Sequence, residues 1–342
     1  MIPFFKPTLR RKDMNAVLQT MVDEQIGPGE RKNEFLSLFC ERIEAKGGIA
    51  LRSYPDALIA ALQLADIGEE AKIGVSVLSP LLYRSVADAL GVTLVFGDID
   101  PEHGCLSQSE AQRLVNEEGC STLLIHEPLC QIPYGAEYKE LGVLIIEDIS
   151  QSFQSSFEEE YAGSYGDLVV CAFEEDGIVS TAGGAVLAYK DTRYTKECDA
   201  LFGGERAYRE MPDMNAALGS VQLSTVDEQV ERRRELYATF SKALLKTQHK
   251  VLGIGNIDFQ PNGYGFCAVL DSKAEEAIAF AKKYKVMAKR TFSESLAVEV
   301  EQLYERYPHA LPPFLRAITL PIYPFLKKSD VELLLKVISN LP

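Results

Sequence analysis

The chain has 342 residues, of which 46% are hydrophobic and 25% charged, as in a globular protein with room for a large and a smaller domain. Its formal net charge of −15 argues against nucleic acid or an anionic membrane as a partner. No apolar run approaches the roughly 20 residues of a membrane helix, and the start MIPFFKPTLRRKD lacks a signal peptide's apolar stretch, which predicts a cytoplasmic protein.

Short apolar runs alternate with helix-length amphipathic segments through the first two-thirds of the chain. We expect helices at 31–46, 56–65, 82–90, 108–117 and 214–240, the last with a solvated charged face that includes Arg233. The strand candidates are 73–78, 93–99, 122–127, 143–148, 168–173 and 185–189. Because these strands are almost continuously apolar, they indicate a mainly parallel sheet covered by helices on both faces.

The pattern changes after about residue 245. The strand-like KVLGIG and GFCAVL precede the helical KAEEAIAFAKKYK, the proline-punctuated LPIYPFL and the helical SDVELLLKVIS. This order predicts a small α+β domain at 245–342, after an N-terminal segment and large domain at 1–244.

Cysteine and histidine are spaced too widely to suggest a structural site. The seven cysteines form no C-x-x-C pair, and we expect them to be reduced thiols, several of them buried on strands. The four histidines are far apart in sequence, so we expect no histidine-rich metal site.

A series of phrases along the chain resembles motifs of the DegT/DnrJ/StrS family of sugar aminotransferases. They are IPFFKP, IGPGERKNEFLSLFCERI, GVTLVFGDIDPEHGCLS, VLIIEDISQSF, AGSYGDLVVCAF, MPDMNAALGSVQL and LPIYPFLKKSDVELLLKVI. They occur in the family's order from end to end. The resemblance implies the fold type I architecture of pyridoxal phosphate (PLP) enzymes, with a three-layer αβα large domain, a mainly parallel sheet and a small C-terminal α+β domain.

The resemblance also implies cofactor-binding positions. In the family, the acid of an E-D pair keeps the pyridine nitrogen of PLP protonated, which makes the ring an electron sink. Asp148 matches this acid and Gln151 matches the glutamine that follows it. Ser53 matches the serine of the phosphate-binding turn.

The family's Schiff-base lysine does not occur at its matching position. That position lies four residues after Phe173 and is Gly177, and no lysine occurs between Lys139 and Lys190. An amine is needed to form the internal aldimine and to move the proton between carbons. We therefore expect no catalytic lysine and no covalently bound PLP, which leaves non-covalent binding of PLP or pyridoxamine phosphate (PMP).

The phosphate-binding turn also departs from the family's S-G-T-x-A-L. Tyr54, Pro55 and Asp56 follow Ser53, so a bulky ring replaces glycine, a backbone donor is lost and a carboxylate repels the phosphate. The serine of the family's F-S-F, another phosphate ligand, is Ala172. We expect these changes to weaken PLP binding strongly.

Further side chains complete the candidates for a pocket. The threonine–aromatic pair that stacks on the ring in the family matches Ser79 and Pro80, and Tyr83 is the nearest aromatic residue. His126 ends a strand at the ligand-binding edge, where it either lines the pocket or is structural. The run Glu174–Asp176 suits a hard cation, but a solvated turn explains it more simply, and we expect no metal. The pocket candidates are Tyr54, Ser79, Tyr83, His126, Ala172, Glu174 and Asp176.

Two functions remain open. The first is an atypical or non-catalytic member of the family, a pseudoenzyme that binds a nucleotide-sugar-like ligand or a partner subunit. The second is an active PLP- or PMP-dependent sugar aminotransferase, or a dehydratase-like transferase, in polysaccharide or amino-sugar biosynthesis. The resemblance further implies a dimer, either a homodimer or a heterodimer with a paralogue.

Overall fold

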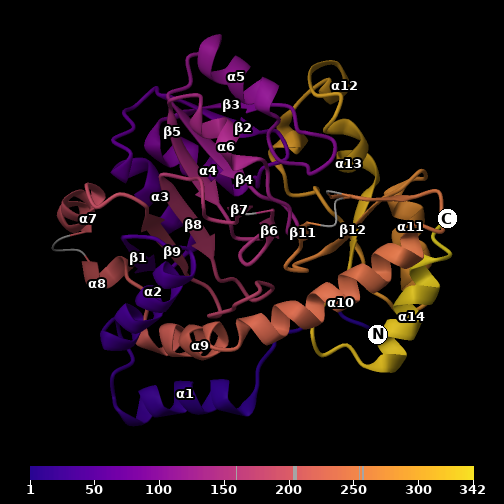
Figure 1. Ribbon diagram of the computed structural model, residues 1–342, viewed down its shortest axis with the longest axis horizontal. Helices are drawn as coiled ribbons and strands as arrows, with labels where there is room; N and C mark the ends of the chain where they lie inside the picture. The colour runs from indigo at the N-terminus through magenta and orange to yellow at the C-terminus, as the bar shows by residue number, and fades with distance from the viewer. Residues whose placement is uncertain (159, 203–205, 254, 256–257) are drawn as a thin grey trace.

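The computed structural model describes residues 1–158, 160–202, 206–253, 255 and 258–342, and the statements below concern those residues. Figure 1 shows a large part built on a central sheet and a smaller C-terminal part beside it, with the long helix α10 (Val226–Leu244) running along both. The fold is α/β with a mostly parallel central sheet, as predicted.

Within the described residues the central sheet contains seven strands, in the order β1-β9-β8-β5-β4-β2-β3. Neighbouring strands from β3 through β8 are parallel, whereas β9 is antiparallel to both β8 and β1. The strands are Gly47–Leu51 (β1), Lys72–Ser76 (β2), Thr93–Gly97 (β3), Thr122–His126 (β4), Leu144–Asp148 (β5), Leu168–Ala172 (β8) and Ala185–Tyr189 (β9).

Helices bury both faces of this sheet, because successive strand residues point to opposite sides and nearly all of them are apolar. One face packs against α3 (Tyr54–Leu64), α4 (Leu82–Leu90) and α7 (Tyr194–Phe202). The other face packs against α2 (Glu30–Arg42), α9 (Asp213–Leu223), α5 (Gln108–Asn116) and α6 (Gly135–Lys139). Helix α1 (Arg11–Val22) forms an outer layer on α9, away from the sheet (Figure 1), and α8 covers Arg206–Arg209.

The C-terminal part is built on an antiparallel sheet in the order β10-β12-β14-β13. Its strands are Lys250–Val251 (β10), Phe266–Val269 (β12), Lys289–Arg290 (β13) and Ala317–Leu320 (β14). The sheet shares a core with α11 (Ala274–Lys283), α14 (Lys328–Ile338) and the second half of α10. Three short helices complete this part: η1 (Leu296–Glu299), α12 (Leu303–Arg306) and α13 (Leu311–Arg316).

Several connections tie the parts together. The N-terminal segment crosses to the C-terminal part, where Ile2 forms a parallel bridge with Val286. A second small sheet, β11-β6-β7, joins Phe259–Gln260 (β11) to Ser156–Phe157 (β6) and Glu160–Tyr161 (β7). Because α10 contributes to the cores of both parts, the domain boundary expected near Leu244 stays a prediction.

The structure corrects three expectations drawn from the sequence. Strand β1 was missed, since GGIAL opens with two glycines, which are poor strand formers. The single helix expected at 214–240 is two, α9 and α10, because the hydroxyls of Ser224 and Thr225 donate to the carbonyl of Val221 and compete with the helix ladder. Arg233, expected on a solvated face, is only 4% exposed because loops of the C-terminal part cover it.

Other expectations hold or lie outside the described residues. The helix expected at 82–90 forms at Leu82–Leu90, and the remaining expected strands and helices form within a few residues of their predicted ends. All seven cysteines are buried thiols. KVLGIG forms only the short β10, and its Ile254 is not among the described residues. In the part of the chain that the structure describes, no helix is long and apolar enough to cross a membrane.

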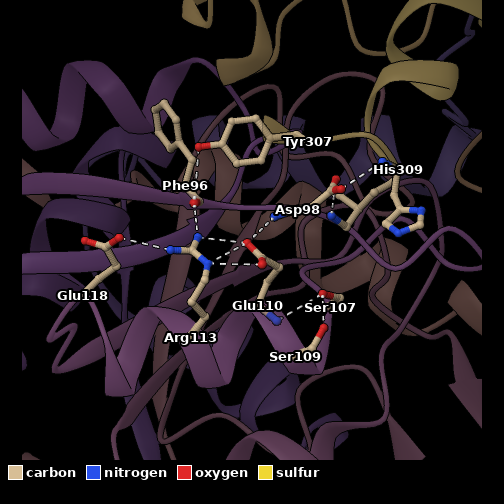
Figure 2. A network of polar contacts seen from close by, with 10 residues as sticks. Phe96, Asp98, Ser107, Ser109, Glu110, Arg113, Glu118, Tyr307 and His309 are labelled. Carbon is tan, nitrogen blue, oxygen red and sulfur yellow. Dashed lines mark hydrogen bonds and ion pairs between the residues drawn. The ribbon is translucent and has the colours of Figure 1, made fainter. Parts of the chain in front are cut away.

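Asp98 fastens the end of β3 to the C-terminal part (Figure 2). Its Oδ1 accepts hydrogen bonds from the backbone N–H of Ile99 (2.8 Å) and Ala310 (2.9 Å), and its Oδ2 accepts one from His309 (2.9 Å). The Asp98 carboxylate therefore satisfies N–H groups at the start of α13. Glu110 accepts the Asp98 N–H at 3.1 Å, and Arg113 binds that glutamate in turn.

We expect Asp98→Ala to lower the free energy of unfolding by about 2–4 kcal/mol, since it leaves three N–H groups without their acceptor at a site 5% exposed. Urea denaturation would measure the loss. Glu118→Ala, at the solvent-exposed end of the same network, is the control, and its cost should stay below about 1 kcal/mol. Equal losses in the two variants would contradict this role of Asp98.

Candidate functional site

The candidate site lies at the carboxyl edge of the central sheet, where ligands bind in open α/β sheets. Strands β4 and β5 end side by side there, with His126 opposite Asp148 in the register, and β8 ends next to them at Ala172. All three residues are buried at the ends of their strands, which hold the imidazole of His126 and the carboxylate of Asp148 in place. The sheet topology therefore places the expected ring-binding acid next to a histidine.

Asp148 is fully buried and has hydrogen-bond donors on both carboxylate oxygens. The hydroxyls of Tyr54 and Tyr83 both donate to Oδ2. Ser150 donates to Oδ1 through its backbone N–H at 3.1 Å and its hydroxyl at 2.6 Å. His126 Nδ1 lies 3.4 Å from Oδ2, an ion-pair distance without hydrogen-bond geometry.

The charges in this cluster follow from its burial. Burial alone would raise the pKa of Asp148, but its contacts with His126, Ser150 and Tyr54 outweigh that effect and hold the pKa below the usual value. Burial, and then the charge of Asp148, raise the pKa of Tyr54 and of Tyr83 well above the ordinary value. The cluster is therefore a buried carboxylate held by two neutral tyrosines.

The N-terminus of α3, where the resemblance implies a phosphate-binding turn, is also occupied by side chains. Ser53 caps the helix by accepting the N–H of Asp56, and its hydroxyl donates to the Asp56 carboxylate at 2.6 Å. Arg209 Nε lies 3.9 Å from the other oxygen of Asp56. Pro55 stands in the first turn, where it removes one backbone donor. The chain's own carboxylate thus lies at the helix end, where an anion would bind.

The position expected to carry lysine is in a tight turn. The N–H of Gly177 donates to the carbonyl of Glu174 at 3.0 Å. A Cβ added at Gly177 would lie 2.7 Å from the carbonyl oxygen of Val179 and 3.1 Å from that of Glu174. Because both neighbours are backbone atoms, any side chain at this position requires the turn to move.

A cleft of about 160 Å³ lies beside the Asp148 cluster, between the sheet edge, the N-terminal segment and the C-terminal part. Phe4, Phe5 and Lys6 line it from the N-terminal segment, and the C-terminal part adds hydroxyls from Thr291, Ser295 and Thr319. The cationic lining residues are Lys6, Arg233 and Lys289, and the acidic ones are Glu175, Asp176 and Glu294. We refer below to this space as the cleft.

The structure separates the residues expected at one pocket. His126, Gln151 and Asp176 line the cleft. Tyr54 and Tyr83 lie on Asp148 instead, and none of these three lines the cleft. Ser79 and Ala172 are buried outside its wall, and Glu174 is exposed on the turn. Ser53 caps α3 and does not line the cleft.

Gln151 and Asp176 have structural partners of their own. The Gln151 side-chain oxygen accepts the backbone N–H of Leu129 at 2.9 Å. Asp176 accepts a hydrogen bond of 3.0 Å from the hydroxyl of Tyr264. In the described residues, no group of three or more histidine, cysteine, aspartate or glutamate side chains is placed to hold a metal ion.

Sequence patterns signal only weakly which cleft residues lie outside the sheet. Lys6 stands in the quoted IPFFKP, but nothing in that phrase predicts that it crosses to the C-terminal part. Lys289 Nζ lies 4.4 Å from the centre of the Phe4 ring, a cation–π contact between distant segments. The position of Arg233 in the cleft could not be predicted, because it stands in a run of charged residues on α10.

The residues present do not fit PLP in the pose that the resemblance implies. A carboxylate offers about four acceptor sites, and Asp148 already has four hydrogen bonds from protein donors. A ring nitrogen could reach Asp148 only if Tyr54 or Tyr83 moved away. A phosphate at α3 would meet Asp56, a like charge.

Two buried acids, Glu127 and Glu147, are the chain neighbours of His126 and Asp148. Burial raises the pKa of Glu127 well above its ordinary value, and the neighbouring charge of Glu147 raises it further. Burial also raises the pKa of Glu147, to about 7, although backbone N–H groups of Gly166 and Gly163 oppose this. The printed partners of both carboxyls are donors: Ser152 and Tyr165 on Glu127, and backbone N–H groups of Gly163, Tyr165 and Gly166 on Glu147. Burial therefore favours the protonated form of both glutamates more than it would at the surface.

We expect Glu127→Gln to stabilise the protein more at pH 8 than at pH 5. A raised native pKa gives stability that is present below the unfolded value of about 4.5 and lost as the pH rises through the native value. Glutamine is nearly the same size and keeps an oxygen that can accept from Ser152 or Tyr165, without this titration. Thermal unfolding at both pH values would measure the effect, with the exposed Glu117→Gln as control, and an equal gain at both would count against it.

Comparison with known proteins agrees with this architecture. The sequence model of the DegT/DnrJ/EryC1/StrS aminotransferase family matches residues 7–339. The chain is 21% identical to the spore coat polysaccharide biosynthesis protein SpsC of Bacillus subtilis, over 99% of this chain and 97% of that protein. It is 23% identical to the GDP-perosamine synthase of Escherichia coli O157:H7, over 70% of this chain and 71% of that one.

Solved structures share the fold across nearly the whole chain. The aminotransferase TlmJ of Streptoalloteichus hindustanus has a TM-score of 0.89 at 20% identity, covering 99% of this chain and 98% of its own. The putative sugar aminotransferase Spr1654 of Streptococcus pneumoniae, in its PMP form, has a TM-score of 0.90 at 16% identity, with the same coverage of 99% and 98%. From the sequence match over almost its full length, the chain belongs to the DegT/DnrJ/EryC1/StrS aminotransferase family.

Proposed function

We propose that this chain is a family member that binds a nucleotide-sugar-like ligand in the cleft, in polysaccharide or amino-sugar biosynthesis, without carrying out transamination. The observation that carries the proposal is Gly177, which lines the cleft at the position where the family's lysine is expected. No amine is available at that position to form an aldimine. The setting follows from relatives such as SpsC, whose name places it in spore coat polysaccharide synthesis.

The cleft suits a polar ligand, with three cationic side chains that can meet phosphate groups and three acidic ones beside them. The N-terminal segment contributes Lys6 to the lining. The C-terminal part contributes Lys289 and the threonines Thr291 and Thr319. Lysine ammonium groups suit phosphate oxygens, and threonine hydroxyls suit a sugar. Aromatic side chains such as Phe4 supply apolar surface for a base or ring.

A second candidate is an active PLP- or PMP-dependent transferase. The family is PLP-dependent, and one relative was solved in a PMP form. The specific observation in favour is that Lys6 and Lys289 line the cleft, so a lysine from outside the sheet edge is close to the site. Borohydride reduction after incubation with PLP, followed by peptide mass spectrometry, tests it: a pyridoxyl adduct on either lysine would favour this candidate and contradict the first.

Calorimetric titration with dTDP- and GDP-linked hexoses tests the proposed ligand class. We expect binding to the wild-type protein, about tenfold weaker binding to Lys289→Met, and wild-type binding to Lys282→Met. The control makes the same charge change on α11, outside the cleft. Absence of binding by every nucleotide hexose, or equal weakening in both variants, would contradict the proposal.

We also propose that the partner is a second copy of the chain, docked on α1. Met14, Leu18, Met21 and Val22 form one stripe along this helix and are 52–73% exposed. Such a stripe on an outer helix is typical of an interface. Sedimentation should find a dimer that Leu18→Glu with Met21→Glu dissociates, whereas Tyr304→Glu, at another exposed position, should not. A wild-type monomer that pairs only with a paralogue would overturn this homodimer.

A further inference from the structure

The region that the resemblance assigns to the cofactor ring contains two tyrosine side chains. Tyr83 is 1% exposed, and both tyrosine hydroxyls donate to the Asp148 oxygen that faces away from Ser150. A protonated ring nitrogen would make the same kind of contact, a donor directed at a buried carboxylate. The chain therefore satisfies Asp148 without any bound molecule.

The region assigned to the phosphate contains a carboxylate of the chain. Asp56 lies in the first turn of α3, where the helix dipole favours an anion, and it is held by Ser53 and faced by Arg209. A carboxylate thus takes the place of the phosphate at one end. At the other end, tyrosine hydroxyls take the place of the ring nitrogen.

The hydrogen bonds of Ser150 connect Asp148 to Ala172 at the end of β8. Its hydroxyl donates to Asp148 and accepts the backbone N–H of Ala172 at 2.9 Å, at the position where the family has a phosphate-binding serine. The cleft lining includes His126 and Gly177 but none of Ser53, Tyr54, Asp56, Tyr83 or Ala172. The cleft therefore ends beside this cluster, in which Tyr83, Asp148 and Ala172 are buried while Ser53, Tyr54 and Asp56 are partly exposed.

We propose that Tyr54, Tyr83 and Asp56 close the cofactor site from within, so that the folded chain binds neither PLP nor PMP, even non-covalently. The proposal rests on the proposed function for its location in the family's site, and it goes further, because a missing lysine alone would still allow PMP to bind. Tyr54 is the residue to change, since it is partly exposed at the start of α3 and less enclosed than Tyr83.

PMP is the probe that tests the closure, because it carries its own amine and needs no lysine. Equilibrium dialysis and thermal shift with PMP would compare the wild type with Tyr54→Gly, Tyr54→Phe and the exposed control Tyr304→Ala. We expect binding only by Tyr54→Gly, at least about tenfold tighter than any residual wild-type binding. Tyr54→Phe keeps the ring and should stay without PMP. Near-ultraviolet circular dichroism confirms that each variant is folded, and Tyr54→Ala replaces the glycine variant if that one is not.

Binding of PMP by the wild type would overturn the closure. So would a folded Tyr54→Gly or Tyr54→Ala that binds PMP no better than wild type, or a Tyr54→Phe that binds it as well as the opened variants. The proposed function has separate readouts, the borohydride adduct with PLP and the titration with nucleotide hexoses. A wild type that binds PMP but forms no adduct would refute the closure and leave that function standing.

Discussion

Asp148→Ala is expected to lower the free energy of unfolding by about 3 kcal/mol or more. The substitution leaves the buried hydroxyl of Tyr83, and those of Tyr54 and Ser150, without their common acceptor. Each hydrogen bond to a charged group contributes about 1.5–3 kcal/mol, and the removal of an unfavourably buried charge offsets part of the sum. Urea denaturation of the purified protein, with no cofactor added, would measure the loss.

The control for this prediction is Glu174→Ala, which removes an exposed carboxylate nearby. Its effect should stay within about 0.5 kcal/mol. A small loss for Asp148→Ala would mean that the tyrosines find other partners and that Asp148 waits for an external ligand. That outcome would count against a self-contained cluster.

Gly177→Lys is expected to leave the protein without an aldimine and without transaminase activity. The new Cβ would lie 2.7 Å from the carbonyl oxygen of Val179, so the turn must shift and the amine is displaced from its intended direction. Misplacement by about 1 Å can cost roughly 10²-fold in rate even in an intact site. Absorbance spectra with added PLP, followed by an amino-donor assay, would test this.

A combined variant shows whether the obstacle is distributed over the site. Tyr54→Gly and Pro55→Thr reopen the start of α3, Ala172→Ser restores a hydroxyl, and Gly177→Lys adds the amine. We expect this variant to bind PLP more tightly than the single substitution, although Asp56 still repels the phosphate. If Gly177→Lys alone gave a PLP-bound, transaminating protein, the account of an obstructed site would be wrong.

The proposed closure and the neighbouring cleft give one way in which a member of this family would keep the fold and lose transamination. The cluster on Asp148 stabilises the sheet edge from inside, as a bound cofactor would, since it supplies the buried carboxylate with donors. The cleft needs only the sheet edge, the N-terminal segment and the C-terminal part, which remain in contact. Under the proposed function, a ligand can bind in the cleft without transamination at Asp148.

The order of the strands and helices could be predicted from the sequence, because apolar periodicity and end-to-end motifs are local signals. The sequence also placed Asp148 at a strand end and Gly177 in the turn after a strand, where the structure has them, while their roles stay predictions. The break between α9 and α10 was missed because serine and threonine also occur inside helices, so the Ser224–Thr225 pair does not by itself predict a helix end.

Only the tertiary structure decided what each site residue contacts. The sequence indicated that Tyr54 and Asp56 obstruct a phosphate, but their contacts with Asp148 and Arg209 join segments distant in the chain. Lys6 and Lys289 meet at the cleft for the same reason, since the N-terminal segment crosses to the C-terminal sheet. Local pattern fixes which elements form, whereas burial and charge pairing across the fold determine whether Asp148 holds a cofactor or the protein's own tyrosines.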